Sequence, residues 1–301
     1  MRTRMGISVN VLNFGPGKKA LAVELGEFVA GLRFEDLPPA VVDKAKAVVN
    51  HAVTVAMAGF DAARTAAARR AVIAHERLGA RGVGRGQGAT LWVDGARVTR
   101  AGAAFANGVA VAVNNQCDSY HMLTHPGVLI VPAGLATAEG EGRTGRELLA
   151  ALAAGYEVQC RCARDFIPST PAHGFRASPV YGILGCAATT AKLLGLDAAR
   201  TASAIALAAS FAGSLIEGQR TGARDADFAE AQAARSGMWA AALAAEGFEG
   251  APTALEGEGR SEPTSTRSLP ISAGAGSFST SSSRSIPPPA SISRSSGWPT
   301  R

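Results

Sequence analysis

The chain has 301 residues, of which 47% are hydrophobic, and this is enough for one large domain with a sizeable core. The formal net charge is +6, but the segment 261–301, with four arginines and one glutamate, supplies half of that excess, so the rest of the chain is only mildly basic. Without a stripe of lysine and arginine, this charge is only weak evidence for nucleic acid and fits an anionic metabolite at least as well, so no nucleic-acid partner is expected. Every apolar run is interrupted by Gly, Asn, Pro or charge, which argues against a membrane span.

The cysteine pattern bears on compartment and cofactors. Cys117, Cys160, Cys162 and Cys186 form neither a CxxC pair nor the Cys/His spacing of a zinc site. They predict buried thiols in a reducing cytoplasm, and the lack of a cysteine cluster argues against an iron–sulfur dehydratase. We therefore expect a cytoplasmic protein without a metal or other cofactor.

Helical patterns begin near the N-terminus. The spacing predicts helices over 21–34 and 39–60, the second opened by Pro39, and Asp61 is expected to cap a third helix through about Leu78. The glycines of 81–88 (RGVGRGQG) invite comparison with a phosphate-binding loop. They precede a strand-like segment, however, and no Gly-Lys-Ser/Thr follows, so a flexible connector is the favoured interpretation.

The segments ATLWVD and ARVTR flank Asp94-Gly95, which predicts a hairpin with a two-residue turn. Thr144 and Glu147 form a capping box. The later expected elements are helices over 101–113, 126–139, 178–194 closed by Gly195, a helix capped by Asp197, and 228–246 ended by Gly247. These patterns predict a mainly α fold, a large all-helical domain with one small β-hairpin.

The composition changes abruptly after Arg260. The segment 261–301 is rich in serine and proline and lacks periodicity, so it buries too little apolar area to offset its chain entropy. We therefore divide the chain into an N-terminal segment 1–20, a helical domain 21–259 and a disordered tail 260–301.

A polar insert between two apolar runs is the strongest candidate for a functional site. Asn115 borders it, and it contains Asp118, Ser119, His121 and His125. A polar connection at the rim of a core is where pockets form, and a helix beginning near Pro126 would direct free N–H groups at an anionic ligand. The alternative is an interhelical loop with solvated histidines.

Three stretches carry a family resemblance over roughly Val23 to Gly259. The runs ANG…NNQCDSYHMLTHPG…VPAGLATAE, GRELLAALAAGYEV and HGFRASPVYGILGCAATTAKLLGLDAARTASAIALAAS resemble the MmgE/PrpD family in order and spacing. That family includes 2-methylcitrate dehydratase, cis-aconitate decarboxylase and related lyases and epimerases of small polycarboxylic acids. The resemblance implies a small polycarboxylate substrate, no cofactor and a homodimer.

Family members typically continue into a second, α/β lid domain, and no such sequence is recognisable after Gly259. We expect a shifted reading frame or a premature end near Glu258 to be the cause. A natural Ser/Pro linker or interaction tail is the alternative.

The resemblance also implies roles for residues of the polar insert. His125 in Thr124-His125-Pro126-Gly127 looks like the motif histidine that lines the active site. Ser119 stands where the family has a threonine, and Asp118 matches the last Asp of an Asp-Phe-Asp-Asp-Thr-like run. Asn115 falls at the first Asp of that run, and an amide cannot act as a carboxylate base. His121 has no counterpart, which favours a surface histidine.

Two further family positions are substituted. Arg176 replaces the histidine of a Gly-Phe-His-Pro-Thr-like run and could clamp a carboxylate. His173 could transfer protons only if its loop bends inward, and a plain loop residue is the alternative. The family lysine that precedes an Ala-Ala-Lys-His-Gly-like run is replaced by Ala226.

The leading hypothesis is therefore a lyase acting on a small polycarboxylic acid such as 2-methylcitrate and impaired by truncation. Its expected catalytic residues are His125, Asn115, Ser119 and Asp118, and its expected substrate-binding residues are Arg176, His173 and His121. The alternative is a catalytically silent helical protein that binds a ligand or dimerises.

Overall fold

The computed structural model describes residues 19–79, 88–121, 123–167 and 169–256. The elements in chain order are α1 (Leu21–Gly31), η1 (Phe34–Asp36), α2 (Pro39–Ala58), α3 (Ala63–Glu76), β1 (Ala89–Thr90), β2 (Arg97–Val98), α4 (Arg100–Ala112), α5 (Pro126–Glu141), α6 (Gly145–Ala163), η3 (Pro171–His173), α7 (Ala177–Leu194), α8 (Ala198–Ser210), α9 (Glu217–Thr221) and α10 (Ala226–Ala245). The prediction of a mainly α fold with one small hairpin is confirmed.

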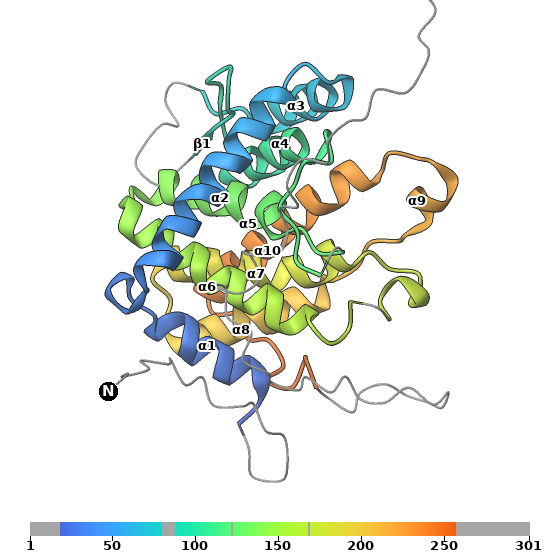
Figure 1. Ribbon diagram of the computed structural model, residues 1–301. Coiled ribbons are helices and arrows are strands. Elements are labelled where there is room, and N and C mark those ends of the chain that lie inside the picture. The colour runs from blue at the N-terminus through green and yellow to red at the C-terminus, as the bar shows by residue number, and fades with distance from the viewer. Residues whose placement is uncertain (1–18, 80–87, 122, 168, 257–301) are drawn as a thin grey trace, which may run out of the picture.

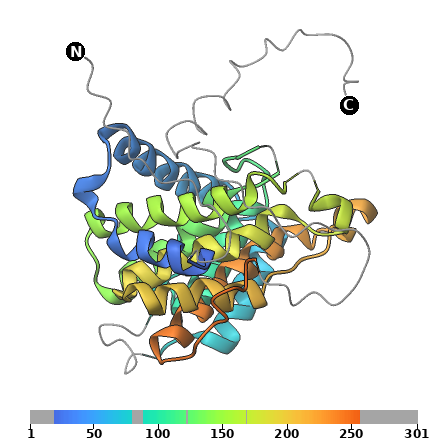
Figure 2. The same cartoon turned by 90° about the horizontal axis from the view of Figure 1, so that it is seen from below.

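Helix α7 lies at the centre of the bundle and packs against α5, α6, α8 and α10 (Figure 1). Helix α4 packs against α5 and α10, and α2 and α3 cover it from outside. Seen from below, α1 lies beside α8 and α6 beside α7 (Figure 2). The short helix α9 lies at the edge of the bundle opposite the hairpin (Figure 1).

Glycine allows α7 to approach its neighbours closely. A Cβ atom on Gly237 of α10 would lie 2.5 Å from the carbonyl oxygen of Ile183, and one on Gly185 would lie 2.8 Å from the carbonyl oxygen of Gly155 on α6. Both distances are below van der Waals contact, so these helices meet backbone to backbone.

Local signals set several helix ends as predicted. Thr144 Oγ1 accepts from the Glu147 N–H, and Glu147 accepts in return from the Thr144 N–H at 2.8 Å, which completes the capping box. Gly195 ends α7 in the left-handed conformation with φ 75°. Asp197 accepts from the Arg200 N–H at 2.8 Å and caps α8. Pro126 occupies the first turn of α5.

Two local predictions are wrong. Helix α3 begins at Ala63 with Ala62 as its N-cap, so Asp61 lies one residue too early to cap it. The strands pair Ala89 with Val98 and Thr90 with Arg97, and the Leu91 N–H donates to the Ala96 carbonyl oxygen at 2.9 Å, so residues 92–95 form a longer connection in place of a two-residue turn. The short helices η1, η3 and α9 were not predicted.

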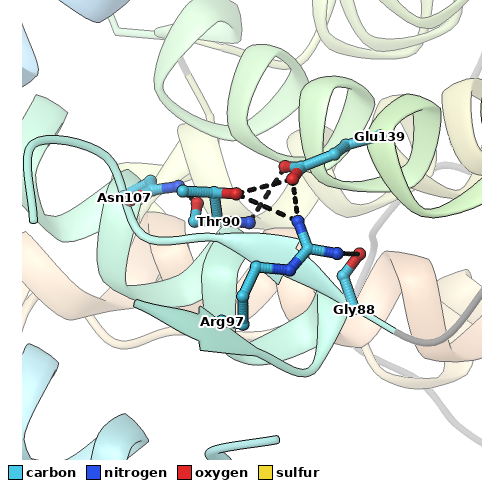
Figure 3. A network of polar contacts seen from close by, with 5 residues as sticks. All are labelled: Gly88, Thr90, Arg97, Asn107 and Glu139. Carbon is cyan, nitrogen blue, oxygen red and sulfur yellow. Dashed lines mark hydrogen bonds and ion pairs between the residues drawn. The ribbon is translucent and has the colours of Figure 1, made fainter. Parts of the chain in front are cut away.

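The hairpin is joined to the bundle by a polar network (Figure 3). Arg97 pairs with Glu139 of α5 and donates to the Gly88 carbonyl oxygen at 3.1 Å. The Thr90 N–H donates to Glu139 at 2.9 Å, and Asn107 of α4 donates to the Thr90 carbonyl oxygen at 3.1 Å. One carboxylate thus joins both strands to α5.

The predictions for the connector 81–87 and the tail 260–301 lie outside the described residues, as does nearly all of the N-terminal segment. Among the described helices, none combines the length and the apolar character needed to cross a membrane.

Candidate active site

The connection from α4 to α5 carries the polar insert. Asn115, the third residue after the end of α4, adopts a left-handed conformation with φ 52°, a geometry that asparagine tolerates better than most residues. The Tyr120 N–H donates to the Thr124 carbonyl oxygen at 2.7 Å, which closes a tight turn around His121. His121, with φ 47°, is exposed at the tip of this turn.

His125 is held at the start of α5 by two contacts. Its N–H donates to Ser178 Oγ of α7 at 2.7 Å, and its Nδ1 lies 2.8 Å from the Asp118 carbonyl oxygen. A carbonyl oxygen only accepts, so Nδ1 carries the proton in the neutral ring. Nε2 is therefore the basic nitrogen, and it has no hydrogen-bond partner among the described residues.

Asp118 fixes the same loop through its side chain. Its carboxylate accepts from the Gly127 N–H of α5 at 2.8 Å and from the Tyr156 hydroxyl of α6 at 2.7 Å. Burial, and then the charge of Asp118, raises the pKa of Tyr156 well above its ordinary value, so the hydroxyl remains a donor. The Asp118 carboxylate therefore ties the polar insert to both α5 and α6.

A cavity of about 150 Å³ lies beside His125. Its walls come from α4, the polar insert, α5, the residue before α7, α9 and α10: Ala112, Asn115, Cys117, His125, Val128, Arg176, Gln219, Ala226, Asp227 and Glu230. Larger cavities of about 330 Å³ lie elsewhere and include none of the predicted site residues. Since pockets for drug-sized ligands typically measure roughly 300–1,000 Å³, this one suits only a small molecule.

Three of the predicted residues, His125, Asn115 and Arg176, thus meet at one cavity. Ser119 is not in its wall, and its hydroxyl is buried without a hydrogen-bond partner among the described residues. His173 is exposed on η3, where its Nδ1 lies 2.8 Å from the Ser169 carbonyl oxygen, so its loop does not bend inward. His121 also lies outside the wall.

Arg176 precedes α7 and is held by the connection between α8 and α9. Its N–H donates to the Ser214 carbonyl oxygen at 3.0 Å, and its guanidinium pairs with Glu230 of α10. The Arg176 side chain is 11% exposed and that of Glu230 is 5% exposed, so the pair is largely removed from water.

Sequence reasoning missed the two acids of the cavity. Asp227 and Glu230 are buried on one face of α10, and Asp227 pairs with Arg64 of α3. In the sequence they look like a solvated acidic helix start. Their spacing of three residues, among alanines on the same face, was the signal that could have identified them.

The acids also affect the thiol in the wall. Burial, followed by the charges of Asp118, Glu230 and Asp227, raises the pKa of Cys117 to about 12. The thiol is therefore neutral at physiological pH and a poor nucleophile. Among the described residues, no three His, Cys, Asp or Glu side chains are placed to hold a metal ion together.

Several known proteins are similar in sequence to this chain. Cis-aconitate decarboxylase of Homo sapiens is 35% identical over 164 residues, covering 51% of this chain and 33% of the human protein. A cis-aconitate decarboxylase-like protein of Aspergillus oryzae is 28% identical over 243 residues, covering 76% and 48%. Cis-aconitate decarboxylase of Aspergillus terreus is 26% identical over 282 residues, covering 87% and 55%.

The chain thus spans between a third and about half of the length of these relatives. The sequence profile of the MmgE/PrpD N-terminal domain matches residues 23–262, which is most of the chain. The chain therefore belongs to the MmgE/PrpD family.

Proposed function

We propose that the cavity beside His125 binds a small polycarboxylic acid and supports lyase chemistry on it, with His125 moving the proton and Arg176 holding a carboxylate. One observation carries the proposal. A histidine whose Nδ1–H is fixed on a carbonyl oxygen, so that Nε2 is basic, lines the same cavity as a largely buried arginine.

Two reactions of such acids need this pair of groups. In an elimination, a base takes the proton next to a carboxylate, the C–H electrons form the double bond, and the hydroxyl leaves as water after receiving a proton. In a decarboxylation, the electrons of the broken C–C bond stay on the substrate as CO₂ leaves, and a proton is delivered to carbon. Nε2 of His125 can take or give that proton, and Arg176 can bind the neighbouring carboxylate.

Two wall positions point to slow chemistry. Asn115 offers an amide where the family has an aspartate, and Ala226 offers a methyl group where it has a lysine; both line the cavity. Loss of one positioned acid or base costs about a hundredfold to ten-thousandfold in rate. We therefore expect ligand binding to be easier to detect than turnover.

The test is isothermal titration of the full chain with cis-aconitate and 2-methylcitrate, together with absorbance at the enoate band for turnover. His125→Ala and Arg176→Ala are expected to weaken binding. The matched controls His75→Ala and Arg70→Ala, both exposed on α3, are expected to leave it unchanged.

No binding by the wild-type chain, or equal binding by all four variants, would refute the proposal. Binding without turnover would favour the catalytically silent alternative, because the site would recognise the acid without converting it.

A further inference from the structure

Glu230 is a buried carboxylate that the proton-transfer scheme does not use. It lies on α10, one turn after Asp227, and is 4% exposed. Its partner is Arg176, and both residues line the cavity that contains His125. A carboxylate of the protein is therefore already bound to the arginine that is expected to hold the substrate.

The guanidinium retains donors for a second acceptor. Nη2 of Arg176 donates to Glu230, whereas Nε and Nη1 are buried and have no hydrogen-bond partner among the described residues. Buried donors without a partner favour an incoming carboxylate. The same carboxylate meets the negative charge of Glu230 in surroundings that screen it less than water does.

We propose that Glu230 is a specificity-determining residue, an internal carboxylate that competes with the substrate for Arg176 and lowers the affinity of the cavity for highly charged acids. This inference rests on the proposed function, since it concerns the same cavity and the same class of ligand.

Asp227 provides an internal comparison. It is 5% exposed, lines the same cavity and lies on the same helix. Its partner, however, is Arg64, which does not line the cavity. Removing the charge of Asp227 therefore changes the net charge of the site as much as removing that of Glu230, but does not release Arg176.

The test compares Glu230→Gln with Asp227→Asn by calorimetry, using a tricarboxylate (cis-aconitate), a dicarboxylate (maleate) and a monocarboxylate (crotonate). Glu230→Gln is expected to bind cis-aconitate at least about tenfold more tightly than wild type, with a smaller gain for maleate and the smallest for crotonate. Asp227→Asn is expected to gain less than about threefold for each acid. Equal gains in both variants, or no gain in Glu230→Gln, would overturn the proposal.

A second measurement avoids the risk that Glu230→Gln does not fold. The ¹⁵N resonance of Arg176 Nε, assigned by its absence in Arg176→Lys, is expected to shift when the wild-type chain is titrated with cis-aconitate. If the resonance does not move at saturation, the proposal that Glu230 and the ligand compete for Arg176 is refuted. Wild-type binding that His125→Ala weakens, without a gain in Glu230→Gln, would refute this inference alone, whereas no binding by either protein would refute the proposed function as well.

Discussion

Replacing Tyr156 by Phe tests whether Asp118 holds the loop that presents His125. The substitution deletes one hydroxyl from a residue that is 5% exposed and whose oxygen lies 2.7 Å from the Asp118 carboxylate. A hydrogen bond to a charged group contributes about 1.5–3 kcal/mol to the free energy of unfolding, and one between neutral groups about 0.5–1.5 kcal/mol. We expect a loss in the first range, because the carboxylate keeps only its contact with the Gly127 N–H among the contacts described above.

Tyr181→Phe is the matched control. Tyr181 is 9% exposed, and its hydroxyl lies 2.8 Å from the neutral Thr170 hydroxyl. Both variants remove the same atom from a buried ring, so the charge of the partner is the main difference between them. Urea unfolding followed by circular dichroism measures both losses of unfolding free energy. The slope of that free energy against urea must be equal in the wild type and the two variants. A loss in Tyr181→Phe that equals or exceeds the loss in Tyr156→Phe would refute the reasoning.

Three further outcomes are expected. Gly237→Ala, which places a methyl group against backbone of α7, is expected to cost about 1–3 kcal/mol in urea unfolding, whereas Gly145→Ala, with open space around it, is expected to stay within about 0.5 kcal/mol of wild type. Hydrogen bonds from Thr144 lower the pKa of Glu147 below its ordinary value of 4.5. The contribution of this carboxylate to stability is therefore fully present above pH 4.5 and is lost as the pH falls through the lowered pKa. Glu147→Gln is therefore expected to flatten the acid limb of stability against pH, and an unchanged limb would contradict this. Because the pKa of Cys117 is raised to about 12, iodoacetamide at about pH 8 is expected to modify it in urea but not in the native protein, as read by peptide mass spectrometry.

Helix boundaries could be predicted where a local interaction sets them. Thr144 and Glu147 satisfy each other within one turn, and Gly195 supplies a conformation that few other residues adopt, so each signal is complete within a few residues. The prediction that Asp61 caps α3 was wrong by one residue, because nothing in the local sequence shows that Ala62 and not Asp61 precedes the first turn. The short helix α9 has too few residues to show a period.

The cavity could be predicted only in part, for a related reason. His125 and Asn115 lie in one short insert, and the family resemblance added Arg176 from elsewhere in the chain. Asp227 and Glu230 were missed because their partners lie 163 and 54 residues away in the sequence. In the sequence, a buried acidic residue on a helix looks the same as a solvated one, because the arginine that pairs with it is far away in the chain.

The backbone-to-backbone contacts of α7 restrict how this sequence can diverge over evolutionary time. A core of interlocking leucine and isoleucine side chains tolerates exchanges among large residues, because neighbouring rotamers can rearrange. A peptide carbonyl facing Gly237 or Gly185 has no rotamer to change. Related chains are therefore expected to keep glycine at these two positions, while the side chains of the cavity wall remain free to change and to acquire new specificities.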